Sequence, residues 1–124
     1  MKSAMAVAIG VCLVACAEIP RRPVAPPVIP PSVASLRTIT ISRDQLLPLS
    51  ARVRAKTRWQ YVGALAEGDV YRPTNTVLSV EGSHIHEAYL VLRDSKTLVG
   101  YYLPVEGALS MLDAPVPIDT AQAD

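Results

Sequence analysis

The stretch between residues 52 and 61 constrains the fold more than any other, because its side chains alternate strictly between two kinds. Basic residues occupy every second position: Arg52, Arg54, Lys56 and Arg58. Apolar or hydroxyl residues stand between them, and Trp59 continues that second set. Successive side chains of a β-strand point to opposite faces of the sheet. The pattern therefore predicts a half-buried strand with a basic solvent face and an aromatic end in the core.

A similar alternation, interrupted by turn residues, recurs along the chain. Further strands are predicted at residues 36–42, 70–72, 76–80, 84–93 and 97–103, followed by an extended segment at 113–117. The apolar strands at 84–93 and 97–103 flank a tight connection and form the clearest hairpin. Turns are expected at 68–69, 73–75 and 81–83, since Gly, Pro, Asn and Asp favour them. The sequence therefore predicts a small antiparallel meander sheet or a partly open barrel.

Two short segments favour helical turns. Ser42 to Gln45 resembles a capping box, with a hydroxyl residue followed three positions later by Gln, and Pro48 limits any helix there to about one turn. The segment 107–112 is the second candidate. We therefore expect a mainly β domain at residues 36–118 with one or two helical turns, followed by a flexible tail at 119–124. A body of this length supports one modest core.

A proline-rich segment precedes the predicted domain. Six of the eleven prolines lie between residues 19 and 32. Proline fixes φ and biases the residue before it away from helix, so this segment is expected to be an extended spacer of about 40 Å. The alternative is a docking strip for an aromatic-lined groove or a cell-wall polymer. In either case residues 16–35 form a tether between the domain and whatever the N-terminus is attached to.

The N-terminus has the parts of an export signal. Lys2 supplies a positive charge, an uncharged apolar run follows, and small residues precede Cys16. The run is too short to cross a bilayer, which takes about 20 apolar residues. Leu13-Val14-Ala15-Cys16 resembles the lipobox of bacterial lipoproteins. The resemblance implies a signal peptide at residues 1–15, cleavage before Cys16, a diacylglyceryl thioether on its sulfur and an acylated, for example palmitoylated, amine.

Two expectations follow from that resemblance. Cys12 would leave with the signal peptide and Cys16 would be alkylated, so the mature domain would have neither a free thiol nor a disulfide. Enterobacterial lipoproteins stay in the inner membrane when Asp follows the cysteine, whereas here Ala17 follows. The resemblance therefore favours the outer membrane over the inner membrane, with the domain on the periplasmic side.

The charge of the chain is unevenly distributed. Residues 17–58 hold eight Lys or Arg against two acidic residues, while residues 59–124 hold three against nine. The basic face Arg52, Arg54, Lys56 and Arg58 can pair with acidic strands of the same domain or remain solvated. Alternatively, it can meet an anionic envelope partner or cell-wall component. Nucleic acid is not expected, because the aromatic residues are not interleaved with the basic ones.

His84 and His86 are the only histidines, and on a strand both would share a face. A catalytic zinc site needs three protein ligands, and Glu87 points to the opposite face. Two solvent-facing histidines are therefore expected in preference to a metal site. Neither a phosphate-binding Gly loop nor a carboxylate pair is present. We expect no cofactor and no enzymatic activity.

Three functions are compatible with these features. The first is a lipid-anchored structural or assembly subunit that docks on a larger envelope complex. The second is a binding protein of the inhibitor or exclusion type, whose sheet face blocks an enzyme or a transfer apparatus. The third is metal binding through His84 and His86. The sequence favours the first of these.

Overall fold

The computed structural model describes residues 19–27 and 37–122. The prediction of a mainly β, antiparallel fold is confirmed for these residues. The strands are β1 (Arg22–Pro23), β2 (Thr38–Ile41), β3 (Gln45–Leu47), β4 (Ala51–Val53), β5 (Arg58–Leu65), β6 (Gly68–Pro73), β7 (Leu78–Glu81), β8 (Ile85–Arg93), β9 (Thr97–Leu103), β10 (Ala108–Pro117) and β11 (Thr120–Gln122). One 3-10 turn, η2 (Pro48–Ser50), interrupts the strands of the described chain.

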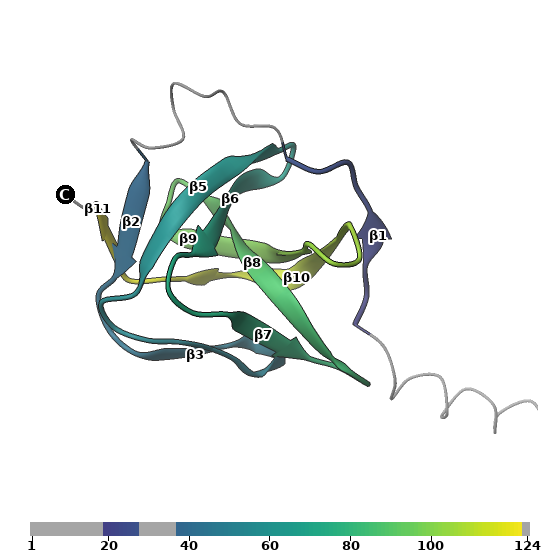
Figure 1. Ribbon diagram of the computed structural model, residues 1–124, viewed down its shortest axis with the longest axis horizontal. Coiled ribbons are helices and arrows are strands. Elements are labelled where there is room, and N and C mark those ends of the chain that lie inside the picture. Colours follow the sequence, from purple (N-terminus) through teal and green to yellow (C-terminus); the bar gives the residue numbers. More distant parts are fainter. Residues whose placement is uncertain (1–18, 28–36, 123–124) are drawn as a thin grey trace, which may run out of the picture.

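Nine of the described strands form one open sheet (Figure 1). Its order is β1-β10-β9-β8-β6-β5-β2-β11, and β7 also pairs with β8. The sheet is not closed into a barrel, because β1 and β11 end this order without pairing with each other. β3 and β4 form a separate two-stranded hairpin.

The long strand β8 is shared between two neighbours on one of its edges. Its second half pairs with β6, where Leu90 lies opposite Tyr71, and its first half pairs with β7, where Ala88 lies opposite Leu78. On the other edge β8 and β9 form the hairpin that the sequence predicts, with Arg93 opposite Thr97. Since β7 also contacts β4 and η2, it connects the large sheet with the small hairpin.

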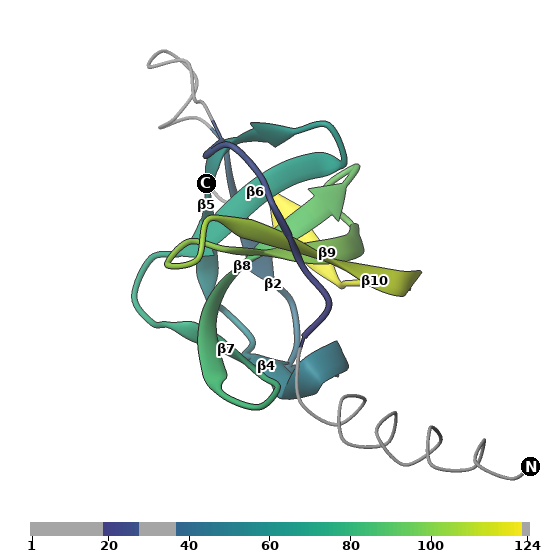
Figure 2. The same ribbon diagram turned by 90° about the vertical axis from the view of Figure 1, so that its right-hand side faces the viewer.

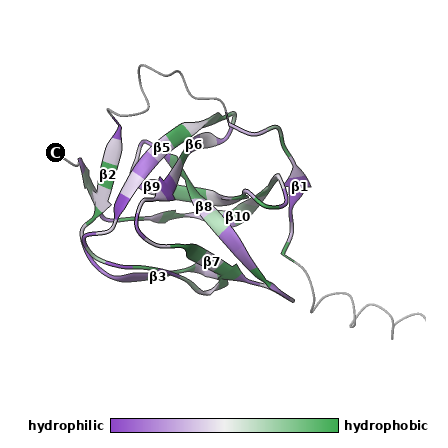
Figure 3. Cartoon of the chain, viewed as in Figure 1, coloured by the Kyte–Doolittle hydropathy of each residue, from purple (hydrophilic) through white to green (hydrophobic). Residues whose placement is uncertain are grey.

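The main core lies between the large sheet and the β3–β4 hairpin. Its largest fully buried side chains include Trp59, Tyr71 and Tyr101. The hydroxyl of Tyr101 donates a hydrogen bond of 2.6 Å to the carbonyl of Pro48, which ties η2 to the sheet. Burial raises the pKa of Tyr101 well above its usual value. In Figure 3 hydrophobic and hydrophilic segments alternate along β5, and the two apolar residues of β7, Leu78 and Val80, are its buried ones.

A second, smaller cluster covers the opposite face of the sheet. It consists of Val70, Val91, Val99, Tyr102 and Leu109, and Val24 packs against it. Strand β9 contributes to both clusters, so almost its whole length is buried. A strand buried on both faces has a continuous apolar run, which accounts for the composition of residues 97–103.

The strand predicted at residues 52–61 is two strands, so that part of the prediction is wrong. β4 ends at Val53 and β5 begins at Arg58. Between them Lys56 adopts a positive φ of 69°, and the N–H of Ala55 donates a 2.7 Å hydrogen bond to Asp44. The sequence pattern does not reveal this turn, because more buried and more exposed residues continue to alternate across it. Trp59 is buried, as predicted, with 1% of its surface exposed.

Neither segment predicted to be helical is a helix, although η2 meets the expectation of one or two helical turns in the domain. Residues 108–117 form strand β10, and Gly107, with a φ of 63°, makes the turn before it. Gln45 begins strand β3 instead of closing a capping box. The 3-10 turn starts at Pro48, the residue expected to stop a helix. Residues 68–69, expected as a turn, already belong to β6 because the turn lies just before them.

The two ends of the predicted domain also differ from expectation. Residues 120–122 form β11 beside β2, and the Thr120 hydroxyl donates a 2.6 Å hydrogen bond to the Ser95 carbonyl, so these residues are no flexible tail. In the proline-rich segment, β1 pairs with β10, and Ile19 is buried in the main core. Figure 2 shows this segment crossing the sheet. Residues 19–27 therefore pack on the domain instead of spacing it, whereas 28–36 lie outside the described residues.

Candidate functional site

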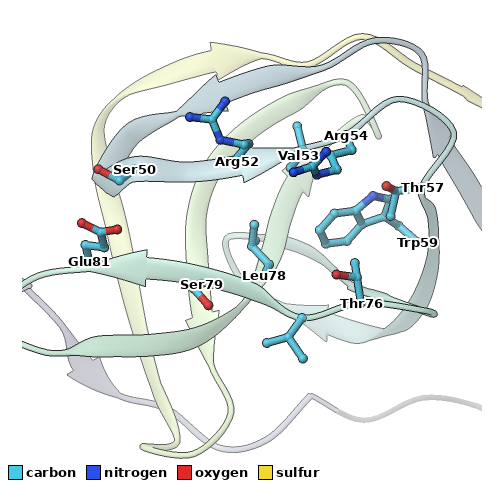
Figure 4. Close-up of a pocket in the computed structure, with 11 residues that line it drawn as sticks. Ser50, Arg52, Val53, Arg54, Thr57, Trp59, Thr76, Leu78, Ser79 and Glu81 are labelled. Carbon is cyan, nitrogen blue, oxygen red and sulfur yellow. The ribbon is translucent and has the colours of Figure 1, made fainter.

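A cleft of about 290 Å³ opens between β4 and β7, beside the buried Trp59 (Figure 4). Its lining comes from η2, β4, the turn after β4, β5, the β6–β7 connection and β7. The lining residues are Ser50, Arg52, Val53, Arg54, Thr57, Trp59, Thr76, Val77, Leu78, Ser79 and Glu81. The cleft is therefore built where the small hairpin meets the large sheet.

The backbone geometry of the β3–β4 turn shapes the β4 side of the cleft. Leu49 and Ser50 both have a positive φ, 62° and 60°, which turns the chain sharply from β3 into β4. The same turn is tied to the sheet by the bond between Tyr101 and Pro48. In β4 the buried Val53 alternates with the exposed Arg52, so the two side chains point to opposite faces of the strand, and both residues contribute to the lining of the cleft.

The rim is polar and mainly basic. Arg52 and Arg54 contribute two positive charges, and Glu81 contributes one negative charge from β7. Figure 4 shows Ser50 and Glu81 at one end of the cleft, and Arg54, Thr57 and Thr76 around the indole at the other. Neither Arg52 nor Arg54 forms an ion pair within the described residues. Of the two intramolecular alternatives for the basic face, pairing with acidic strands does not occur for these two residues in the described part of the chain, and both side chains are exposed to solvent.

Trp59 gives the cleft its second recognition element. The indole Nε1 is buried and has no hydrogen-bond partner among the described residues. An indole N–H is a donor only, and leaving a buried donor unpaired costs about 1–3 kcal/mol. Because neighbouring side chains cover Nε1, an oxygen acceptor removes that cost only where those side chains move aside. Together with two guanidinium groups, this arrangement suits a carboxylate or carbonyl oxygen of a bound segment.

The four residues of the predicted basic face divide into two pairs. All four are exposed, as the alternation predicts. Arg52 and Arg54 line the cleft, whereas Lys56 and Arg58 do not. The break at residues 54–57 explains the division, because Arg52 and Arg54 precede the turn, whereas Lys56 lies in it and Arg58 follows it. No pattern in the sequence marks Thr76, Ser79 and Glu81, which reach the cleft from a segment distant from β4.

The structure separates the two histidines. His84 is exposed in the turn before β8, while His86 is 8% exposed. The Nδ1 atom of His86 lies 2.6 Å from Oε2 of Glu106, and this hydrogen bond lowers the pKa of Glu106. The expectation of two solvent-facing histidines is therefore wrong for His86. No group of three His, Cys, Asp or Glu residues is placed to hold a metal within residues 19–27 and 37–122.

Comparison of the chain with protein-family models, curated proteins and solved structures finds no match. None of the described segments is a helix long and apolar enough to cross a membrane. Cys16, the predicted lipidation site, lies outside the described residues.

Proposed function

We propose that this protein is a lipid-anchored subunit of the bacterial outer membrane that binds an envelope partner on the periplasmic side. The anchor is the lipid expected on Cys16, and the binding site is the β4–β7 cleft. The observation that carries the binding role is the pairing of two unneutralised guanidinium groups, Arg52 and Arg54, with the unpartnered indole N–H of Trp59. This combination favours an acidic segment of a partner protein.

The test divides the basic face at the turn. Arg52→Gln/Arg54→Gln removes two charges from the cleft, and Lys56→Gln/Arg58→Gln removes the same charge outside it. We expect only the first variant to lose the partner that copurifies with the detergent-extracted protein, and we expect binding of that partner by wild type to fall with added salt. Equal retention of the partner by both variants, with both folded by circular dichroism, would refute the cleft as the site.

The anchor is tested separately. Cys16→Ala removes the only sulfur at the predicted cleavage site, so incorporation of labelled palmitate should be abolished and the protein should leave the membrane fraction. Incorporation that persists in Cys16→Ala would refute lipidation at that residue. An inhibitor or exclusion role would use the same cleft. An inhibitor would be recognised by a partner that loses its activity on binding. An assembly subunit would instead become part of a larger complex with its partner.

A further inference from the structure

Two aliphatic side chains project from neighbouring turns of the domain. Ile85 is 72% exposed at the start of β8, and Val105 is 77% exposed in the turn between β9 and β10. The hydrogen bond between His86 and Glu106, the residues that follow them, holds these two turns together. The two exposed side chains therefore belong to one end of the molecule.

The N-terminal segment enters the domain at the same end. Ile19 is 3% exposed and packs on the β7–β8 turn, where Gly82 leaves room for it. A Cβ atom at Gly82 would lie 2.6 Å from Cγ1 of Ile19, so a larger residue there would displace the segment. In Figure 1 the β7–β8 turn, the start of the described chain and β1 all lie on the right-hand side. We call Ile19, Gly82, Ile85 and Val105 the anchor face.

The position of Ile19 limits how far the domain can stand from a lipid on Cys16. Three residues of chain span at most about 11 Å. A spacer of residues 16–35 would place the domain several times farther away, but Ile19 is already fixed in the core. A lipidated Cys16 therefore brings the anchor face to the bilayer surface, where an exposed aliphatic side chain gains free energy by entering the apolar layer.

We propose that the anchor face is a membrane-contacting surface and that Ile85 and Val105 enter the interfacial layer of the bilayer. The inference rests on the proposed lipid on Cys16. An apolar surface that lies in the interface is buried about 5–10 Å into the headgroup and acyl boundary. That depth is within reach of Ile85, where β8 begins, and of Val105 in the β9–β10 turn. Since Glu81 lies opposite Ile85 in the β7–β8 ladder, the acidic end of the cleft faces the membrane. A partner then enters the cleft from beside the bilayer.

The test measures how deeply individual side chains enter the bilayer of vesicles made of phosphatidylethanolamine and phosphatidylglycerol. Ile85→Cys and Val105→Cys are made in the lipidated protein, in which Cys16 is acylated, and each new thiol is labelled with the fluorophore NBD. Val77→Cys is the matched control, because Val77 is an aliphatic residue with 64% exposure. It lies four residues before Glu81, about 13 Å along the hairpin from Ile85. We expect several-fold stronger quenching by nitroxide-labelled lipids at positions 85 and 105 than at position 77.

Equal, weak quenching at all three positions would overturn the inference while leaving the lipid anchor intact. Mass spectrometry of the same protein reports the lipid on Cys16 independently. An unmodified Cys16 would instead overturn the proposed anchor, and the membrane orientation with it. As a second measurement, Ile85→Ser/Val105→Ser should leave lipidation unchanged but make residues near the β7–β8 turn more accessible to protease added to the vesicles. Unchanged protection would count against the inference.

Discussion

The two faces of the sheet are built differently. Among the described residues, the main face buries eighteen side chains and the second face five. The main face is closed by β7 and the β3–β4 hairpin, which are held to it by strand pairing and by the Tyr101–Pro48 bond. The second face is only partly closed, with Val24 of the N-terminal segment among the residues that pack against it. We therefore expect the first face to behave as a fixed core and the second, over which the N-terminal segment is paired through only two residues, as an adaptable one.

This difference matters for function because the cleft opens in the main core, whereas the N-terminal segment leads from Ile19 in that core across the second cluster. The cleft opens in the fixed core, so packing sets the apolar wall of Trp59 and Val53 before a partner arrives, whereas the exposed Arg52 and Arg54 side chains become ordered on binding. Preorganised sites bind more tightly because less ordering is lost on binding. The N-terminal segment, by contrast, crosses the adaptable face on its way from the anchor face, and it pairs through only the two residues of β1.

The largest effect is expected from removing the centre of the fixed core. Trp59→Ala deletes a fully buried ring and should lower the free energy of unfolding by about 3–5 kcal/mol, a large part of the total for a small domain. Gln60→Ala, next to it on the half-exposed side of β5, should change it by less than about 0.5 kcal/mol. Urea unfolding of both variants provides the measurement. Equal urea midpoints for the two variants would contradict the burial of the face of β5 that carries Trp59.

A smaller effect should separate the two faces directly. Leu103 in the main core and Leu109 in the second cluster are both at most 1% exposed. Leu→Ala substitutions cost about 2–5 kcal/mol, depending on how far the site can collapse. We expect Leu103→Ala near the upper end and Leu109→Ala near the lower end, because the segment over Leu109 can move inward. Chemical denaturation of the two variants tests this, and a larger loss for Leu109→Ala would reverse the assignment of the fixed and adaptable faces.

Local patterns in the sequence were sufficient for the elements whose partners are close along the chain. The β8–β9 hairpin follows from two apolar runs around residues 93–96, and the structure pairs Arg93 with Thr97 across that connection. The burial of Trp59 follows from alternation alone, because a period of two assigns each side chain to a face whatever the neighbouring strand is. The exposure of Arg52 and Arg54 follows in the same way.

Features that depend on distant partners could not be predicted. The proline content of residues 19–32 indicates an extended chain, but an extended chain serves equally as a spacer or as an edge strand. Only the pairing of Arg22 with Leu109 distinguishes the two. The turn at residues 54–57 preserves the alternation, so the pattern carries no trace of it. The cleft lies between β4 and β7, which are far apart in sequence. No local sequence motif indicates that these two strands come together.

The smallest effect concerns the bond that joins the turns of the anchor face. The hydrogen bond from His86 lowers the pKa of Glu106 below its ordinary value of 4.5, so folding favours the deprotonated carboxylate. This contribution to stability is fully present above pH 4.5 and is lost as the pH falls through the lower, folded-state pKa. Glu106→Gln should therefore lower the melting temperature at pH 7 by a few degrees at most, and the difference from wild type should shrink as the pH falls below 4.5.

Glu81→Gln, which removes the same charge at an exposed position, is the control. A difference between Glu106→Gln and wild type that stays constant down to the lowest pH would show that the bond does not couple protonation of Glu106 to the packing of these turns.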